Sequence, residues 1–125
     1  MKAQPAKLLV IDDDPGVLEA MKLLLVMEGF DVVDAESGAV AVAAARTDAF
    51  DVAITDLKMP GMSGMETLAG LRQIDPSLPV IIASGFLAEG VVAECLSLGA
   101  FACIRKPFDL EDLLALVQRA LRERV

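Results

Sequence analysis

The sequence predicts an α/β fold of the (βα)5 type, a doubly wound, five-stranded parallel sheet with helices on both faces. Short apolar, β-branched runs alternate five times with segments of helical periodicity, which is the pattern of parallel sheets. The runs are apolar almost throughout, as expected of strands that are buried on both sides. The chain of 125 residues, 55% of them apolar and 24% charged, suits a single domain over residues 1–125.

The first predicted strand is the apolar run Leu8–Ile11, which leads directly into three aspartates. Asp14 is placed to cap the helix that follows, and Pro15 to occupy its first position, where proline is well tolerated. This helix has one apolar face, and Gly29 marks its end.

The second and third units repeat the pattern. Phe30–Val33 is predicted as a strand, and Ser37 as the cap of an alanine-rich helix over Gly38–Arg46. Phe50–Thr55 is predicted as the third strand and ends at Asp56. A loop with Pro60, Gly61 and Gly64 then leads into a helix whose apolar residues are Met65, Leu68, Leu71 and Ile74.

The fourth and fifth units complete the sheet. Pro79–Ala83 is predicted as a strand followed by Ser84, and the next helix runs to about Leu98, with Gly99 as its end. Phe101–Ile104 is predicted as the last strand and is followed by Arg105, Lys106 and Pro107. Asp109 is predicted to cap the final helix, which has apolar residues at Leu110, Leu113, Leu114, Val117 and Leu121.

Composition excludes several classes of function. The 11 Lys and Arg against 19 Asp and Glu give a net charge of −8, and the one basic cluster, Arg119, Arg122 and Arg124, suits a helix C-terminus, so direct nucleic-acid binding is not expected. Two cysteines, Cys95 and Cys103, and no histidine exclude a Cys/His zinc site and a histidine triad. No run is long enough for a signal peptide or a membrane span, so a cytoplasmic protein without a membrane partner is expected.

Polar residues gather where the predicted strands end, which is where open α/β sheets bind ligands. Asp12, Asp13 and Asp14 follow the first strand, Asp56 the third, Ser84 the fourth, and Lys106 the fifth. Singly, each suits an ordinary structural role. Together, the carboxylates repel one another unless a hard cation such as Mg²⁺ lies among them. A carboxylate beside Mg²⁺ and Lys106 can act as a nucleophile, and such a site suits phosphoryl transfer.

Four segments, VIDDDP, DLKMPGMSGME, IIASGF and IRKPF, resemble in order and spacing the receiver domain of two-component response regulators. The resemblance covers about Lys7 to Leu121. It implies the chemotaxis-regulator-like, flavodoxin-like strand order 2-1-3-4-5. It also implies a role for each matching residue: Asp56 as phosphoacceptor, Asp13 and Asp12 as Mg²⁺ ligands (Asp12 largely through water), the backbone carbonyl of Lys58 as a further ligand, Ser84 and Lys106 as partners of the phosphoryl group, and a cis Lys106–Pro107 peptide.

The function implied by the resemblance is that of a signalling switch. A sensor histidine kinase or a phosphotransfer protein of a phosphorelay would supply the phosphoryl group from a phosphohistidine. Phosphorylation would then alter the surface formed by the fourth helix, fifth strand and fifth helix, which a downstream domain or protein would read. The domain would catalyse only its own phosphorylation and dephosphorylation. Dimerisation through the last helices remains open.

One position departs from the family pattern. Receivers often carry Tyr or Phe three residues before the lysine, and here that residue is Cys103. Phe101 is expected on the same side of the strand and could substitute, as could Phe86, which with Lys58 is expected near the entrance to the site. An apolar Phe86 would hinder the attacking water and prolong the phosphorylated state.

The same residues are partly compatible with two other functions. The D-x-D within Asp12–Asp14 is also found in phosphatases of the haloacid-dehalogenase type, but their later acidic pair and the following Thr or Val are missing. A flavodoxin-like nucleotide site would need a phosphate-cradling loop after the first strand, where three aspartates stand instead.

Overall fold

The computed structural model describes residues 4–124 and confirms the doubly wound fold. Five parallel strands form one sheet in the order β2-β1-β3-β4-β5, as the resemblance implied. Helices and strands alternate strictly along the chain: β1 (Lys7–Ile11), α1 (Pro15–Met27), β2 (Asp31–Ala35), α2 (Gly38–Thr47), β3 (Val52–Thr55), α3 (Gly64–Ile74), β4 (Val80–Ser84), α4 (Glu89–Ser97), β5 (Ala102–Arg105) and α5 (Leu110–Glu123).

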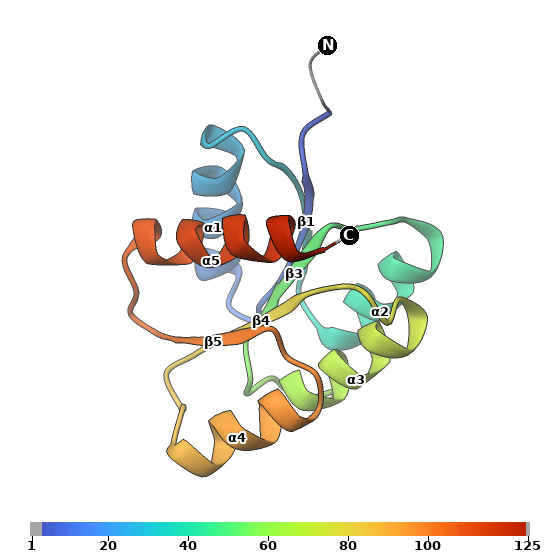
Figure 1. Ribbon diagram of the computed structural model, residues 1–125, viewed down its shortest axis with the longest axis vertical. Coiled ribbons are helices and arrows are strands. Elements are labelled where there is room, and N and C mark those ends of the chain that lie inside the picture. The colour runs from blue at the N-terminus through green and yellow to red at the C-terminus, as the bar shows by residue number, and fades with distance from the viewer. Residues whose placement is uncertain (1–3, 125) are drawn as a thin grey trace.

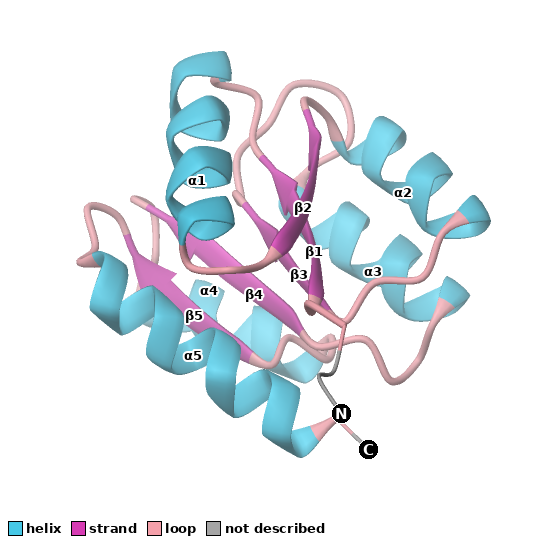
Figure 2. Ribbon diagram, turned by 90° about the horizontal axis from the view of Figure 1, so that it is seen from above, coloured by secondary structure: helices cyan, strands magenta, loops and turns pink. Residues whose placement is uncertain are grey.

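Helices cover both faces of the sheet and divide the core in two. Helices α1 and α5 lie on one face, and α2, α3 and α4 lie on the other (Figures 1 and 2). Because successive strand residues point to opposite faces, Leu8 and Val10 pack toward α1 and α5, while Leu9 and Ile11 pack toward the other three helices. Each such buried side chain contributes about 2 kcal/mol to stability.

The helix starts follow the predicted capping residues, with one exception. Asp14 accepts hydrogen bonds from the backbone N–H groups of Gly16 and Val17, and Ser37 accepts one from Val40. Asp109 does occupy the capping position of α5, but its side chain accepts no hydrogen bond from the helix. Its backbone carbonyl accepts the first bonds of α5 instead, so the prediction of a side-chain cap was wrong.

Four of the five strands begin later than the sequence predicts, and β1 begins one residue earlier, at Lys7. Phe30, Phe50, Pro79 and Phe101 were assigned to strands, but each precedes the first paired residue of its strand. Phe50 is almost completely buried all the same, with 3% of its surface exposed. Burial near a strand does not require membership of its hydrogen-bond ladder, so apolar character alone misplaced these boundaries. Conversely, Ala35, Ser84 and Arg105 lie beyond the predicted strand ends but are paired residues of β2, β4 and β5.

Two of the three arginines near the C-terminus form contacts within the domain. Arg124 forms an ion pair with Asp75 at 2.6 Å and donates a hydrogen bond to the carbonyl of Phe50. Arg119 lies beside Glu123 and over the ring of Phe101. These contacts agree with a structural role for this basic cluster. Within residues 4–124, no helix is both long and apolar enough to span a bilayer.

Candidate functional site

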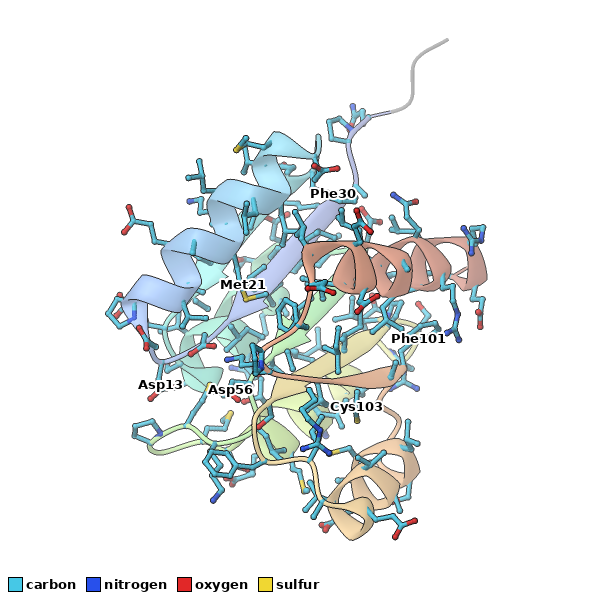
Figure 3. All side chains as sticks on the ribbon, turned by 90° about the vertical axis from the view of Figure 1, so that its left-hand side faces the viewer. Asp13, Met21, Phe30, Asp56, Phe101 and Cys103 are labelled. Carbon is cyan, nitrogen blue, oxygen red and sulfur yellow. The ribbon has the colours of Figure 1, made fainter. Side chains whose placement is uncertain are left out.

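Three carboxylates meet at the carboxyl end of the sheet. Asp12 and Asp13 directly follow β1, and Asp56 follows the neighbouring β3. One carboxylate oxygen from each lies within 4.8 Å of the other two. Asp13 and Asp56 are labelled in Figure 3. Asp12 is buried, Asp56 is partly buried and Asp13 is exposed, so the group opens to solvent on one side. Oxygen donors at this spacing suit a hard divalent cation.

Lys106 supplies the positive charge of this cluster. Its ammonium lies 2.6 Å from Oδ2 of Asp12 and 3.6 Å from Oδ2 of Asp56. The lysine follows β5, at the far edge of the sheet from β2, and reaches its partners across the carboxyl ends of the strands between them. The Lys106–Pro107 peptide is cis, as expected.

Asp56 is held by the backbone around it. Its Oδ1 accepts a hydrogen bond of 2.7 Å from the backbone N–H of Leu57, and its backbone N–H donates to the carbonyl of Ile11. The loop that follows returns so closely that a Cβ on Gly64 would lie 2.2 Å from the Asp56 carbonyl oxygen. Glycine at position 64 is therefore a steric requirement of the loop that carries Lys58. In the same loop Gly61 adopts a φ of 75°, which also favours glycine.

Ser84 ends β4 and is completely buried. Its hydroxyl oxygen accepts a hydrogen bond of 3.1 Å from the backbone N–H of Phe86. Its carbonyl accepts one from the backbone N–H of Lys106, which ties the end of β4 to the lysine. The structure therefore brings Asp12, Asp13, Asp56 and Lys106 together directly and joins Ser84 to them through the backbone.

The loop between β4 and α4 rests against the site through side chains. The Lys58 ammonium lies 4.1 Å from the centre of the Phe86 ring, which confirms that these two side chains are neighbours. Arg105 donates a hydrogen bond of 2.7 Å to the carbonyl of Leu87. No role for Arg105 follows from the sequence. Its place beside Lys106 at the end of a strand was the available signal, but nothing in the sequence showed which carbonyl it binds.

The expectation that Phe101 lies on the same side as Cys103 was wrong. Phe101 packs with the core beneath α1 and α5, whereas Cys103 packs with Cys95 in the opposite core beneath α4 (Figure 3). Phe101 precedes β5, so the alternation of strand residues does not extend to it. Burial, together with the neighbouring Cys95, raises the pKa of the Cys103 thiol to about 11, and burial also raises the pKa of Cys95.

The chain is similar in sequence and structure to known proteins of one family. Residues 8–118 match the family described as response regulator receiver domain. The transcriptional regulatory protein GlrR of Escherichia coli is 38% identical over 98% of this chain, and KdpE of Mycobacterium tuberculosis is 39% identical over 91%. A CheY-like receiver domain protein from Methanospirillum hungatei superposes with a TM-score of 0.92 at 30% identity, covering 96% of each chain.

The chain therefore belongs to the receiver domain family of response regulators, which act in two-component signalling. The comparisons do not support the haloacid-dehalogenase alternative. The chain spans 28% of the length of GlrR and 50% of that of KdpE. The similarity therefore concerns the receiver domain alone, and the activities of the rest of GlrR and KdpE are not carried over to this chain.

Proposed function

We propose that the chain, acting as a single domain over residues 1–125, accepts a phosphoryl group on Asp56. The donor would be a phosphohistidine of a sensor histidine kinase or of a phosphotransfer protein. The observation that carries this proposal is the convergence of Asp12, Asp13 and Asp56 within 4.8 Å, with the Lys106 ammonium 3.6 Å from Asp56. The proposal retains the cytoplasmic location expected from the sequence.

The reaction would be an in-line displacement at phosphorus. An oxygen of the Asp56 carboxylate attacks the phosphorus atom, a P–O bond forms, and the P–N bond of the phosphohistidine breaks. The departing imidazole nitrogen keeps the electron pair and takes up a proton. Because Oδ1 of Asp56 is engaged by the backbone N–H of Leu57, Oδ2 is the freer oxygen to attack. The chain would turn over only its own acyl phosphate.

Mg²⁺ is the cation proposed for the site. Asp12, Asp13, Asp56 and the backbone carbonyl of Lys58 would hold it, and when bound it would neutralise charge on the transferring phosphoryl group. Lys106 would pair with the phosphoryl group once it is attached, and the buried hydroxyl of Ser84 would donate to one of its oxygens. The surface of α4, β5 and α5 would then present the altered state to a downstream domain or protein.

Phosphotransfer from a panel of histidine kinases carrying radiolabelled phosphohistidine tests this proposal. We expect at least one kinase to lose label to the chain within seconds to minutes, only when Mg²⁺ is present. Asp56→Asn should accept no label. Glu28→Gln, which alters a carboxylate at the other end of α1, is the matched control and should accept label as the unaltered chain does. Transfer to Asp56→Asn at the normal rate would overturn the assignment.

A further inference from the structure

The loop between β4 and α4 is fastened by three contacts that all involve the candidate site or its neighbours. The Phe86 N–H donates to the Ser84 hydroxyl at 3.1 Å, and the Lys58 ammonium lies 4.1 Å from the centre of the Phe86 ring. Arg105 holds the carbonyl of Leu87 at 2.7 Å. Two of the three contacts therefore act directly on Phe86.

Both contacts on Phe86 would weaken when Asp56 carries a phosphoryl group. If the Ser84 side chain changes its χ1 rotamer to bring the hydroxyl toward a phosphoryl oxygen, the hydroxyl oxygen would move away from the Phe86 N–H. The added charge of roughly −2 would draw the Lys58 ammonium, two residues along the chain from Asp56, away from the aromatic ring. Phosphorylation would thus release Phe86 from its backbone contact and from its cation–π contact.

A place for the released ring lies beside it. Phe86 has 59% of its surface exposed, an unusual position for a large aromatic side chain. It borders a groove of about 660 Å³ whose apolar wall includes Leu57, Met65, Leu87 and Val91, from the segments around α3 and α4. Moving the ring into this groove would remove apolar surface from water, which is favourable.

The two other residues considered for this role are badly placed. Cys103 is too small to act as a moving aromatic side chain and packs beneath α4. Phe101 packs on the opposite face of the sheet, with its ring 5.4 Å from the guanidinium carbon of Arg119. Among the candidates, Phe86 alone touches Ser84 and also borders an apolar groove.

We infer that Phe86 is the side chain that carries the phosphorylation signal: Ser84 releases its N–H, and the ring moves into the groove between α3 and α4. This inference rests on the proposed phosphorylation of Asp56. Phe86, in the loop before α4, would take the role of the aromatic residue that β5 lacks at Cys103. The first structural change after phosphorylation would then occur beside α3 and α4.

The five phenylalanines of the chain make the inference measurable in the natural sequence. With 4-fluorophenylalanine incorporated, each ring gives a fluorine NMR signal, and Phe86→Leu and Phe101→Leu assign the two that matter. The difference in chemical shift between H₂O and D₂O reports solvent contact. After acetyl phosphate and Mg²⁺ are added, we expect this difference for Phe86 to fall toward that of the buried Phe50, while that of Phe101 stays unchanged.

The intact mass of the same sample tests phosphorylation of Asp56 separately from movement of Phe86. A full gain of mass with an unmoved Phe86 signal would overturn the role of Phe86 and leave the phosphoacceptor proposal standing. Failure to gain mass would overturn both. In Ser84→Ala, compared at equal phosphorylation by mass, the Phe86 signal should move much less. An equal movement in that variant would contradict a route through the Ser84 hydroxyl.

Discussion

The Lys106 ammonium lies 2.6 Å from Oδ2 of Asp12, although 94 residues separate the two in sequence. Only 3% of the Asp12 side chain is exposed, so this carboxylate depends on nearby positive charge. Lys106 supplies it in the structure, and a bound cation would add to it. This relationship gives the lysine a structural role that can be measured separately from any role in phosphorylation.

Replacing Lys106 with Met should destabilise the fold by about 2 kcal/mol at pH 7 without Mg²⁺, because the buried Asp12 carboxylate would lose the ammonium that lies 2.6 Å away. The loss should be smaller at saturating Mg²⁺, since the cation would restore positive charge beside Asp12. Urea unfolding of both chains, with and without Mg²⁺, measures this. Equal losses in the two conditions would indicate that no cation binds near Asp12.

Replacing Gly64 with Ala should destabilise the protein by about 2–3 kcal/mol, because the three atoms nearest the new Cβ all belong to the backbone. The Asp56 carbonyl oxygen would lie at 2.2 Å and the Leu57 Cα at 2.6 Å. Gly90→Ala is the matched control: it lies in α4 with nothing within 4 Å of the new Cβ, so stability should hold or rise. Equal effects of the two substitutions on urea unfolding would refute the close approach.

The ion pair between Arg124 and Asp75 should stabilise the end of α5. Burial acts to raise the pKa of Asp75, but hydrogen bonds from Ser77 and Arg124 outweigh it and hold this pKa below 3.8. A lowered carboxyl pKa adds stability that is present above pH 3.8 and is lost as the pH falls through the lowered value. Arg124→Ala should therefore cost about 1 kcal/mol at pH 7 and less in acid.

Thermal unfolding across this pH range measures the effect. Glu123→Gln is the control: it removes an exposed ion pair with Arg119, whose closest atoms are 3.9 Å apart, and should change stability by less than about 0.5 kcal/mol. If Arg124→Ala were as neutral as Glu123→Gln at pH 7, the ion pair with Asp75 would not contribute to stability.

The two cysteines should be slow to react in the folded protein. The pKa of Cys103 is raised to about 11, from an ordinary value of 9.0, by burial and by Cys95. Since the thiolate is the reacting form, alkylation of Cys103 by iodoacetamide near pH 8 should be about 100-fold slower than for a free thiol. Peptide mass spectrometry measures the rate, and the urea-unfolded chain, in which both thiols should react freely, is the control. A native Cys103 that reacts at the unfolded rate would contradict the raised pKa of this partly buried thiol.

The fold and the site could be predicted from the sequence to different depths. The alternating apolar runs were sufficient to predict the parallel sheet. Asp14 and Ser37 were sufficient to predict the starts of α1 and α2, because capping depends on residues close in sequence. The strand starts were misplaced, since an apolar residue such as Phe50 can be buried outside the ladder. The same limit applies to Phe101, whose side of the sheet depends on the bend before β5, which strand alternation does not describe.

The residues of the site were predictable because parallel strands place their carboxyl ends at one edge. That rule joins Asp12, Asp56 and Lys106 without any knowledge of their contacts. It does not reveal that the Ser84 hydroxyl accepts a bond from Phe86, or that Arg105 binds the carbonyl of Leu87. Such contacts depend on the path of one loop, and the sequence contains no periodic signal for it.

Phosphorylation of Asp56 is tested most directly by intact-mass spectrometry after incubation with acetyl phosphate and Mg²⁺. We predict a gain of about 80 Da, one phosphoryl group, that disappears when the cation is chelated and is absent in Asp56→Asn. A gain of the same size in Asp56→Asn, or none in the unaltered chain, would contradict the assignment of Asp56 as the acceptor.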